Sequence, residues 1–287
     1  MKIPELHNLF LKSSGVSTDT RKINPESLFF ALKGENFNAN DFAAEAIQKG
    51  AAYAIIEEAQ ETMDDRFILV DNVLESLQAL ASFHRRSLNI PILALTGSNG
   101  KTTTKELIHA ALEKKYKTTA TKGNLNNHIG VPLTLLSMDS TTEIGVVEMG
   151  ANHLKEIGFL CKIAQPDFGY ITNFGKAHLE GFGSVEGVIR GKSELYDYLK
   201  EHQKTLFLNI DDPVQQQHLS YSKHFTFGEN EAADVRINYL QQGSFATLKE
   251  AFVNPPVEYS TAPFWVWNDK VTKEKIDNQL QHFKEEN

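Results

Sequence analysis

Residues 92–104 read ILALTGSNGKTTT, and this stretch decides the fold. The run Ile92–Thr96 is short and apolar, which is typical of a buried strand, and a glycine-rich turn follows it directly. A helix pattern begins at about Thr102. Strand, glycine-rich loop and helix in this order are the setting of a phosphate-binding loop. Glycines let backbone N–H groups approach phosphate oxygens, and the helix N-terminus adds partial positive charge.

Two side chains of this loop have expected tasks. Lys101 would reach the β- and γ-phosphates of a nucleotide, and the Thr102 hydroxyl would take a place on Mg²⁺. The spacing departs from the common P-loop, because Leu95 stands where its first glycine would be. The alternative is a glycine-rich turn with Lys101 on a solvated first turn, which the strand–loop–helix context disfavours. The predicted ATP-binding residues of the loop are Gly97, Ser98, Asn99, Gly100, Lys101, Thr102 and Thr103.

Further strand-like runs follow the loop at residues 144–148, 168–172 and 205–209, with helical patterns between them. Such alternation favours a mostly parallel sheet with helices on both faces. The fold class is therefore α/β, with a P-loop ATPase domain at its centre.

The first 85 or so residues predict a smaller α/β unit. Its expected strands are residues 28–32, 54–56 and 67–70, and its expected helices cover 42–47 and 74–83. A turn is predicted at Lys33–Gly34, and Gly50 can cap the first of these helices.

Composition excludes several classes of protein. The chain has 287 residues, 41% hydrophobic and 23% charged, which is ordinary globular chemistry and enough for two domains. The formal charge of −8 argues against a nucleic-acid partner. No apolar run approaches the ~20 residues that span a bilayer, and no signal peptide is recognised, so we expect a cytoplasmic protein without membrane insertion. The single cysteine, Cys161, excludes an internal disulfide and is interpreted as a core residue of a helix.

Four polar residues beyond the loop are candidates for the same site. Glu148 ends an apolar strand, where a carboxylate can hold Mg²⁺ or orient a water, but a solvent-facing strand end is equally compatible. Asn173 and His178 follow the next strand, and a lone histidine there is more often structural. Lys192 fits a solvated helix charge.

These motifs together resemble the Mur ligase superfamily, the ATP-dependent amide-forming enzymes of peptidoglycan synthesis. The similarity to the MurF branch rests on ALKGENFNANDF from residue 31, GNLNNHIGVPLTLL from residue 123 and NFGKAHLEGFGS from residue 173. It extends to about residue 240. The matching stretches are Ser17–Lys22, Ala31–Glu35, Thr96–Thr104, Gly123–Pro132, Glu148–Asn152, Thr172–Ser184 and Gly191–Glu194.

The resemblance implies roles for individual residues. Lys101 and Thr102 would bind ATP phosphates and a first Mg²⁺, and Glu148 and His178 a second. Lys192 is similar to the family lysine that CO₂ carbamylates, which turns a cation into a carboxylate-like metal ligand. The implied catalytic residues are thus Lys101, Glu148, His178 and Lys192, and the implied metal ligands are Thr102, Glu148, His178 and carbamylated Lys192. Residues that would frame the nucleotide are Asn173, Asn209 and Asp212. Residues that would hold the UDP-substrate are Ser17, Asp19, Arg21, Lys33, Asn126, Asn127 and His128.

The resemblance also implies a reaction. ATP, with Mg²⁺, would phosphorylate the terminal carboxylate of UDP-N-acetylmuramoyl-tripeptide. The amine of D-alanyl-D-alanine would then attack the acyl phosphate, giving an amide, ADP and phosphate. We expect a monomer.

The domain organisation departs from the family's three domains. Residues 1–85 would form the UDP-substrate domain, residues 86–242 the central ATP-binding domain and residues 243–287 an unrelated tail. The family's Gly-His-Asn segment and its third, Rossmann-like domain are not found, so we expect a truncated chain with impaired ligase activity. The tail contains Trp265 and Trp267 and a helix pattern over 272–287. It is either a divergent extension or faintly similar to the start of some bacterial glycoside hydrolases.

Two other functions remain open on sequence grounds. One is a nucleotide- or UDP-substrate-binding fragment without ligase activity, since loop and metal residues serve binding as well as catalysis. The other is a MurE-like or folylpolyglutamate-synthetase-like ligase, although the segment around Asp19 argues against the folate enzyme.

Overall fold

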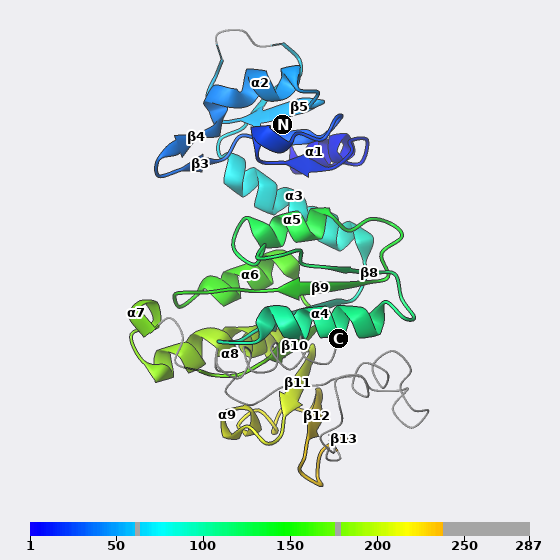
Figure 1. Ribbon diagram of the computed structural model, residues 1–287, viewed down its shortest axis with the longest axis vertical. Coiled ribbons are helices and arrows are strands. Elements are labelled where there is room, and N and C mark those ends of the chain that lie inside the picture. The colour runs from blue at the N-terminus through cyan, green and yellow to red at the C-terminus, as the bar shows by residue number, and fades with distance from the viewer. Residues whose placement is uncertain (61–63, 176–178, 238–287) are drawn as a thin grey trace, which may run out of the picture.

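The structure, a computed structural model, describes residues 1–60, 64–175 and 179–237 (Figure 1). Two α/β units follow one another along the chain, each built on a parallel sheet. The predicted tail 243–287, with its tryptophans and its helix pattern, lies outside the described residues.

The N-terminal unit is a four-stranded parallel sheet in the order β1, β2, β5, β6. Side chains alternate between its two faces because successive residues of a strand point in opposite directions. Phe29 and Ile56 pack toward helix α2, while Phe30 and Ile55 belong to the core shared with α1 and α3. The bounds are α1 Ile3–Phe10, β1 Val16–Ser17, β2 Leu28–Phe30, α2 Ala43–Gln48, β5 Tyr53–Ile56, β6 Phe67–Leu69 and α3 Val73–Leu88.

A short antiparallel hairpin, β3 (Lys33–Gly34) and β4 (Phe37–Asn38), follows β2. The predicted turn at Lys33–Gly34 is therefore wrong, because these residues pair with Asn38 and Phe37 and the chain reverses at 35–36. The Lys33 ammonium also pairs with carboxylates from the end of β5, which holds this strand against the sheet.

The central unit is a seven-stranded sheet in the order β13, β12, β11, β10, β7, β9, β8, and all its pairings are parallel. Leu93 and Leu95 of β7 face α4, while Ile92 and Ala94 face the core under α5, α6 and α8. The predicted parallel sheet with helices on both faces is thus confirmed. The bounds are β7 Ile92–Thr96, α4 Lys101–Leu112, β8 Thr118–Ala120, α5 Gly130–Leu136, β9 Ile144–Glu148, α6 Glu156–Ala164, β10 Phe168–Ile171, α7 Leu179–Phe182, α8 Val185–Glu201, β11 Thr205–Asn209, α9 Pro213–Gln216, β12 His224–Gly228 and β13 Val235–Arg236.

Helix α3 joins the two units (Figure 1). Its fully buried Leu77 and Leu80 lie in one apolar core with residues of α1, α5 and α6. Its Arg85 donates to the carbonyls of Ala164 and Gln165 at the C-terminal end of α6. The predicted domain boundary between residues 85 and 86 falls inside this helix, so the position of that boundary stays a prediction.

Within the described residues, the strands and helices expected from hydrophobic periodicity are present. The Gly50 cap is confirmed, because α2 ends at Gln48 and Gly50 follows with φ +104°. Helix α1 and strands β1, β8, β12 and β13 were not predicted, and the two- and three-residue strands among them are defined by pairing rather than by an apolar run. Among the described residues, no helix has the length and hydropathy needed to cross a membrane.

Candidate functional site

The phosphate loop begins where β7 ends, at the carboxyl edge of the central sheet. Gly97 has φ +145°, and a Cβ at this position would overlap the Thr172 hydroxyl. Gly100 has φ +75° and forms the N-cap of α4 without any side chain that could cap the helix. Both positions therefore require glycine, and the first N–H groups of α4 are left for a ligand.

The residues that follow the neighbouring strand β10 hold the loop in place. Asn173 accepts from the Asn99 N–H at 3.1 Å and donates from its amide to the Asn99 carbonyl at 3.0 Å. The Thr172 hydroxyl donates to the same carbonyl at 2.7 Å. The predicted nucleotide-framing residue Asn173 thus holds the loop itself, which preorganises it for an anion.

Lys101 is folded back over the loop. Its ammonium donates to the carbonyls of Gly97 at 2.9 Å and Ser98 at 3.2 Å. Burial lowers the Lys101 pKa, and the nearby Glu148 carboxylate partly offsets this. The ammonium already lies within the loop, where a bound phosphate would meet it.

Glu148 is 1% exposed, so the solvent-facing interpretation is wrong. Its Oε1 accepts from the Asn126 amide at 2.8 Å and from the Thr102 hydroxyl at 3.3 Å. Its Oε2 is buried and has no hydrogen-bond partner among the described residues. An unpaired buried carboxylate oxygen is costly, so this geometry favours a cation beside it.

The donor set around Glu148 suits a hard cation. A carboxylate oxygen and the Thr102 hydroxyl are ligands that Mg²⁺ accepts, together with water and nucleotide phosphates. No cluster of three or more His, Cys, Asp or Glu side chains among the described residues could hold a metal ion. The predicted ligand His178 lies outside the described residues.

Lys192 is buried too, at 1% exposed, so a solvated helix charge is wrong for it as well. Its ammonium donates to the Ala151 carbonyl at 3.0 Å and lies 5.2 Å from the centre of the Phe182 ring. Burial, and then the Lys101 charge, lower its pKa to about 8. An amine with this pKa is partly neutral near physiological pH, which is the form that reacts with CO₂.

Asn209 ends β11, Asp212 follows it, and both form hydrogen bonds within this segment. The Asn209 carbonyl oxygen of the side chain accepts from the Asp211 N–H at 3.0 Å, and Asp212 caps α9 through the Val214 N–H at 2.9 Å. Buried Gln215 accepts from the Asn209 N–H and donates to Asp212. The structure thus joins these two residues to each other.

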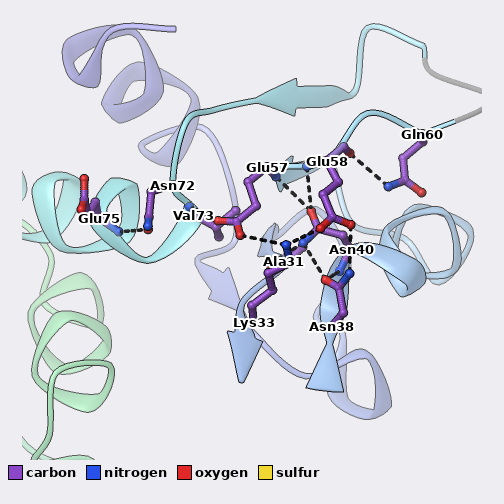
Figure 2. Close-up of polar contacts among 10 residues, drawn as sticks. All are labelled: Ala31, Lys33, Asn38, Asn40, Glu57, Glu58, Gln60, Asn72, Val73 and Glu75. Atoms are coloured by element: carbon purple, nitrogen blue, oxygen red, sulfur yellow. Dashed lines mark hydrogen bonds and ion pairs between the residues drawn. The ribbon is translucent and has the colours of Figure 1, made fainter. Parts of the chain in front are cut away.

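The four predicted UDP-substrate residues of the N-terminal unit lie at the end of β1, in the segment after it and at the start of β3. Ser17 is buried against the Ser27 hydroxyl at 3.0 Å, and Asp19 forms an exposed ion pair with Arg21 at 2.7 Å. Figure 2 shows Lys33 between two carboxylates, Glu57 at 3.5 Å and the closer Glu58. The Lys33 ammonium is therefore already shared by two acidic groups.

The three other predicted UDP-substrate residues lie between β8 and α5. Asn126 is bonded to Glu148, as described above. Asn127 accepts from the Ile129 and Gly130 N–H groups at the start of α5, and the His128 carbonyl accepts from Gln78 of α3. This segment therefore connects the carboxylate of the central unit to the helix shared with the N-terminal unit.

Sequence reasoning missed several buried polar residues around the site. Lys105 and Thr121 lie behind Glu148, and Tyr196 and Gln215 form a buried hydrogen-bonded pair near Asn209. Helical spacing could have indicated Lys105, because it stands three residues before the inward-facing Ile108. The Cys161 interpretation is confirmed, since this thiol is buried in α6 and burial raises its pKa.

Comparison with known proteins gives a consistent result. Residues 12–85 match the Mur ligase family catalytic domain, and residues 95–259 match the Mur ligase middle domain. The second match extends past residue 242, so the start of the unrelated tail stays a prediction.

Curated relatives are similar over much of this chain. A UDP-N-acetylmuramoyl-tripeptide–D-alanyl-D-alanine ligase of Bacillus subtilis is 37% identical over 82% of this chain and 52% of its own length. The ligase of that description from Escherichia coli is 40% identical over 69% of this chain and 44% of its own. This chain thus spans about half the length of the curated relatives it matches.

Solved structures are similar as well. The MurF ligase of Thermotoga maritima in complex with ADP superposes with a TM-score of 0.72 at 32% identity, covering 85% of this chain and 55% of that one. A MurF structure from Acinetobacter baumannii gives a TM-score of 0.70 at 34% identity, covering 79% of this chain and 50% of that one. Because the middle-domain match alone covers more than half of the residues, the chain belongs to the Mur ligase family.

Proposed function

We propose that this chain is the nucleotide- and UDP-substrate-binding part of an ATP-dependent ligase that joins D-alanyl-D-alanine to UDP-N-acetylmuramoyl-tripeptide. The relatives named for this reaction are 37% and 40% identical to it, and one solved MurF neighbour holds ADP. The reaction draws on ATP and a UDP-linked substrate, so we place it in the cytoplasm, and we expect the chain to act as a monomer.

The observation that carries the proposal is the pairing of the phosphate loop with Glu148. The Thr102 hydroxyl joins the two, because it stands in the first turn of α4 and donates to the Glu148 carboxylate. The second oxygen of that carboxylate is buried without a partner among the described residues. A nucleotide phosphate on the loop and a cation on Glu148 would satisfy both halves of this arrangement.

The proposed reaction transfers the γ-phosphoryl group of ATP to the terminal carboxylate of the tripeptide, and ADP leaves. The amine of D-alanyl-D-alanine then attacks the acyl carbon, and phosphate leaves as the amide forms. In the first step negative charge spreads over the phosphoryl oxygens. The Lys101 ammonium and the N–H groups of the first turn of α4 would stabilise that charge, and no side-chain nucleophile is needed.

Thr102 and Glu148 would hold Mg²⁺, with His178 and a carbamylated Lys192 as further ligands. When bound, the metal ion would neutralise negative charge on the phosphate oxygens. Lys192 suits carbamylation because its amine is buried and its pKa is lowered to about 8.

Binding and turnover of the chain as it stands test the proposal. Calorimetry should detect ADP binding that Mg²⁺ tightens, and Lys101→Ala should abolish it. A thermal-shift series should give a higher melting point with UDP-N-acetylmuramoyl-tripeptide than with a folate, since a ligand stabilises the state it binds. Preference for a folate, or no nucleotide binding, would contradict the proposal.

A coupled ADP-release assay addresses the ligase step. ADP release that requires ATP, the UDP-tripeptide and D-alanyl-D-alanine together supports ligation by this chain. If the chain binds ADP and the UDP-tripeptide but does not release ADP in this assay, the second candidate is favoured. This candidate is a unit that binds the substrates of the same reaction without ligating them. The observation that favours this candidate is that the chain spans about half the length of its curated relatives.

A further inference from the structure

Lys105 is a lysine that the proposed reaction does not use, yet its side chain is 0% exposed. It lies in α4, one helical turn after Lys101, and points toward the sheet beside Ile108. Burying an ammonium is costly unless it is paired. Its position therefore calls for a specific task.

The partners of Lys105 indicate that task. Its ammonium donates to the Thr121 carbonyl at 2.6 Å and pairs with Glu106 at 2.8 Å. Glu106 is 60% exposed and contributes little, whereas Thr121 is 2% exposed and directly follows the edge strand β8. An edge strand pairs on one side only, so this charged hydrogen bond gives the end of β8 a second attachment.

Thr121 leads directly to Glu148. The Thr121 hydroxyl accepts from the Glu148 N–H at 2.9 Å, which fixes the main chain at the end of β9. The segment that Thr121 opens ends at Asn126, whose amide donates to the Glu148 carboxylate and whose carbonyl accepts from the Gly150 N–H at 2.7 Å. Both the main chain and the side chain of Glu148 are thus held by the segment that Lys105 anchors.

We propose that Lys105 is a positioning residue that, through Thr121, orients the Glu148 carboxylate toward the cation. It links α4, which starts with Lys101 and Thr102, to the segment that holds Glu148. The inference rests on the proposed binding of a nucleotide with Mg²⁺. Residues that orient a metal ligand typically change metal affinity by about 10- to 100-fold when they are replaced.

The test measures the factor by which saturating Mg²⁺ tightens ADP binding to the full chain, by calorimetry. Lys105→Met removes the ammonium and keeps the length of the side chain, and it should reduce this factor about tenfold. ADP affinity without Mg²⁺ should stay unchanged, because the phosphate loop is intact. A purely structural lysine would change the melting point and leave the Mg²⁺ factor as in the wild type.

Two further variants keep the test decisive. Thr121→Val retains the carbonyl that Lys105 binds and removes the hydroxyl that holds Glu148, so it breaks the same link while the buried lysine stays in place. It should lower the Mg²⁺ factor similarly, and the double variant should be no worse than the more affected single one. Lys114→Met, at an exposed lysine just after the same helix, is the matched control and should leave the factor unchanged.

An unchanged Mg²⁺ factor in both Lys105→Met and Thr121→Val would overturn the inference, as would fully additive losses in the double variant. A wild-type chain that binds ADP equally with and without Mg²⁺ would contradict the proposed function itself. The two failures are therefore distinguishable.

Discussion

Two side chains show what burial does at the scale of the single residue. The sequence pattern around Glu148 and Lys192 is compatible with a solvent-exposed charge at both positions, but each residue is 1% exposed in the folded chain. A buried ionisable group must find partners, change its protonation or bind an ion. Glu148 retains an oxygen without a partner among the described residues, and Lys192 has a lowered pKa.

Replacing Glu148 with Gln tests the unpaired oxygen. The amide preserves the size of the side chain and removes the negative charge, so Mg²⁺-dependent tightening of ADP binding should be lost. Without metal the variant should be at least as stable as the wild type, because a buried negative charge with one unpartnered oxygen is removed. Thermal melts in a chelator and calorimetry with Mg²⁺ check the two halves. Marked destabilisation in the chelator would contradict this account of Glu148.

Carbamylation of Lys192 should depend on pH in a defined direction. Its pKa is lowered to about 8, and only the neutral amine reacts with CO₂. The carbamate should therefore be more abundant at pH 8.5 than at pH 6.5. Carbon-13 NMR with labelled bicarbonate measures it, and Lys192→Met is the control that should lose the signal. A labelled signal of equal size in that variant would show that another amine is modified.

At the scale of the element, the β3–β4 hairpin depends on one buried amide (Figure 2). Asn40 is fully buried, and its side-chain oxygen accepts from the Glu57 and Glu58 N–H groups at 2.9 and 3.3 Å. Its amide donates to the Asn38 side chain at 2.8 Å. The end of β5 and the end of the hairpin are thus tied through a single side chain.

Asn40→Ala should lower the free energy of unfolding by about 2–3 kcal/mol, because several buried polar groups lose their partner at once. Urea denaturation measures this. Asn36→Ala, at the exposed hairpin turn, is the matched control and should change the free energy by less than ~0.5 kcal/mol. Equal effects of the two replacements would show that the amide network does not stabilise the hairpin.

At the scale of the whole molecule, a histidine pair connects the two units. His7 of α1 lies 3.0 Å from His84 of α3, and the other ring nitrogen of His84 lies 2.9 Å from the Met138 carbonyl after α5. A carbonyl only accepts, so that nitrogen of His84 carries a proton. With both rings neutral, His84 therefore accepts from His7 through its other nitrogen.

This pair should make stability depend on pH. Burial lowers the pKa of both histidines, the His84 charge further lowers that of His7, and Met138 and Asp139 partly offset the effect at His84. Because the unfolded chain titrates near 6.5, it binds protons more readily than the folded one, and stability is lost as pH falls below about 6.5. Melting points from pH 7.5 to 5.5 should fall. His84→Gln should flatten the dependence and His202→Gln, at an exposed site, should not. An unchanged slope in His84→Gln would contradict this assignment.

The sequence by itself determined the strands, helices and phosphate loop that a local pattern encodes. Ile92–Thr96 forms the buried strand predicted for it, and Gly97 and Gly100 adopt backbone conformations that favour glycine. These features depend on neighbouring residues, so hydrophobic periodicity and glycine content are sufficient to predict them.

The tertiary structure alone decided which charges are buried and what they contact. Thr121 and Asn126 bond Glu148, and Lys105 bonds Thr121, because β8 pairs with β9 and α4 covers that side of the sheet. This arrangement relates segments up to 43 residues apart in the sequence. The turn predicted at Lys33 is a strand because Lys33 and Gly34 pair with Asn38 and Phe37, and the carboxylates that hold the Lys33 ammonium come from beyond β5. Burial and pairing are properties of packed segments, and no local pattern of the sequence contains them.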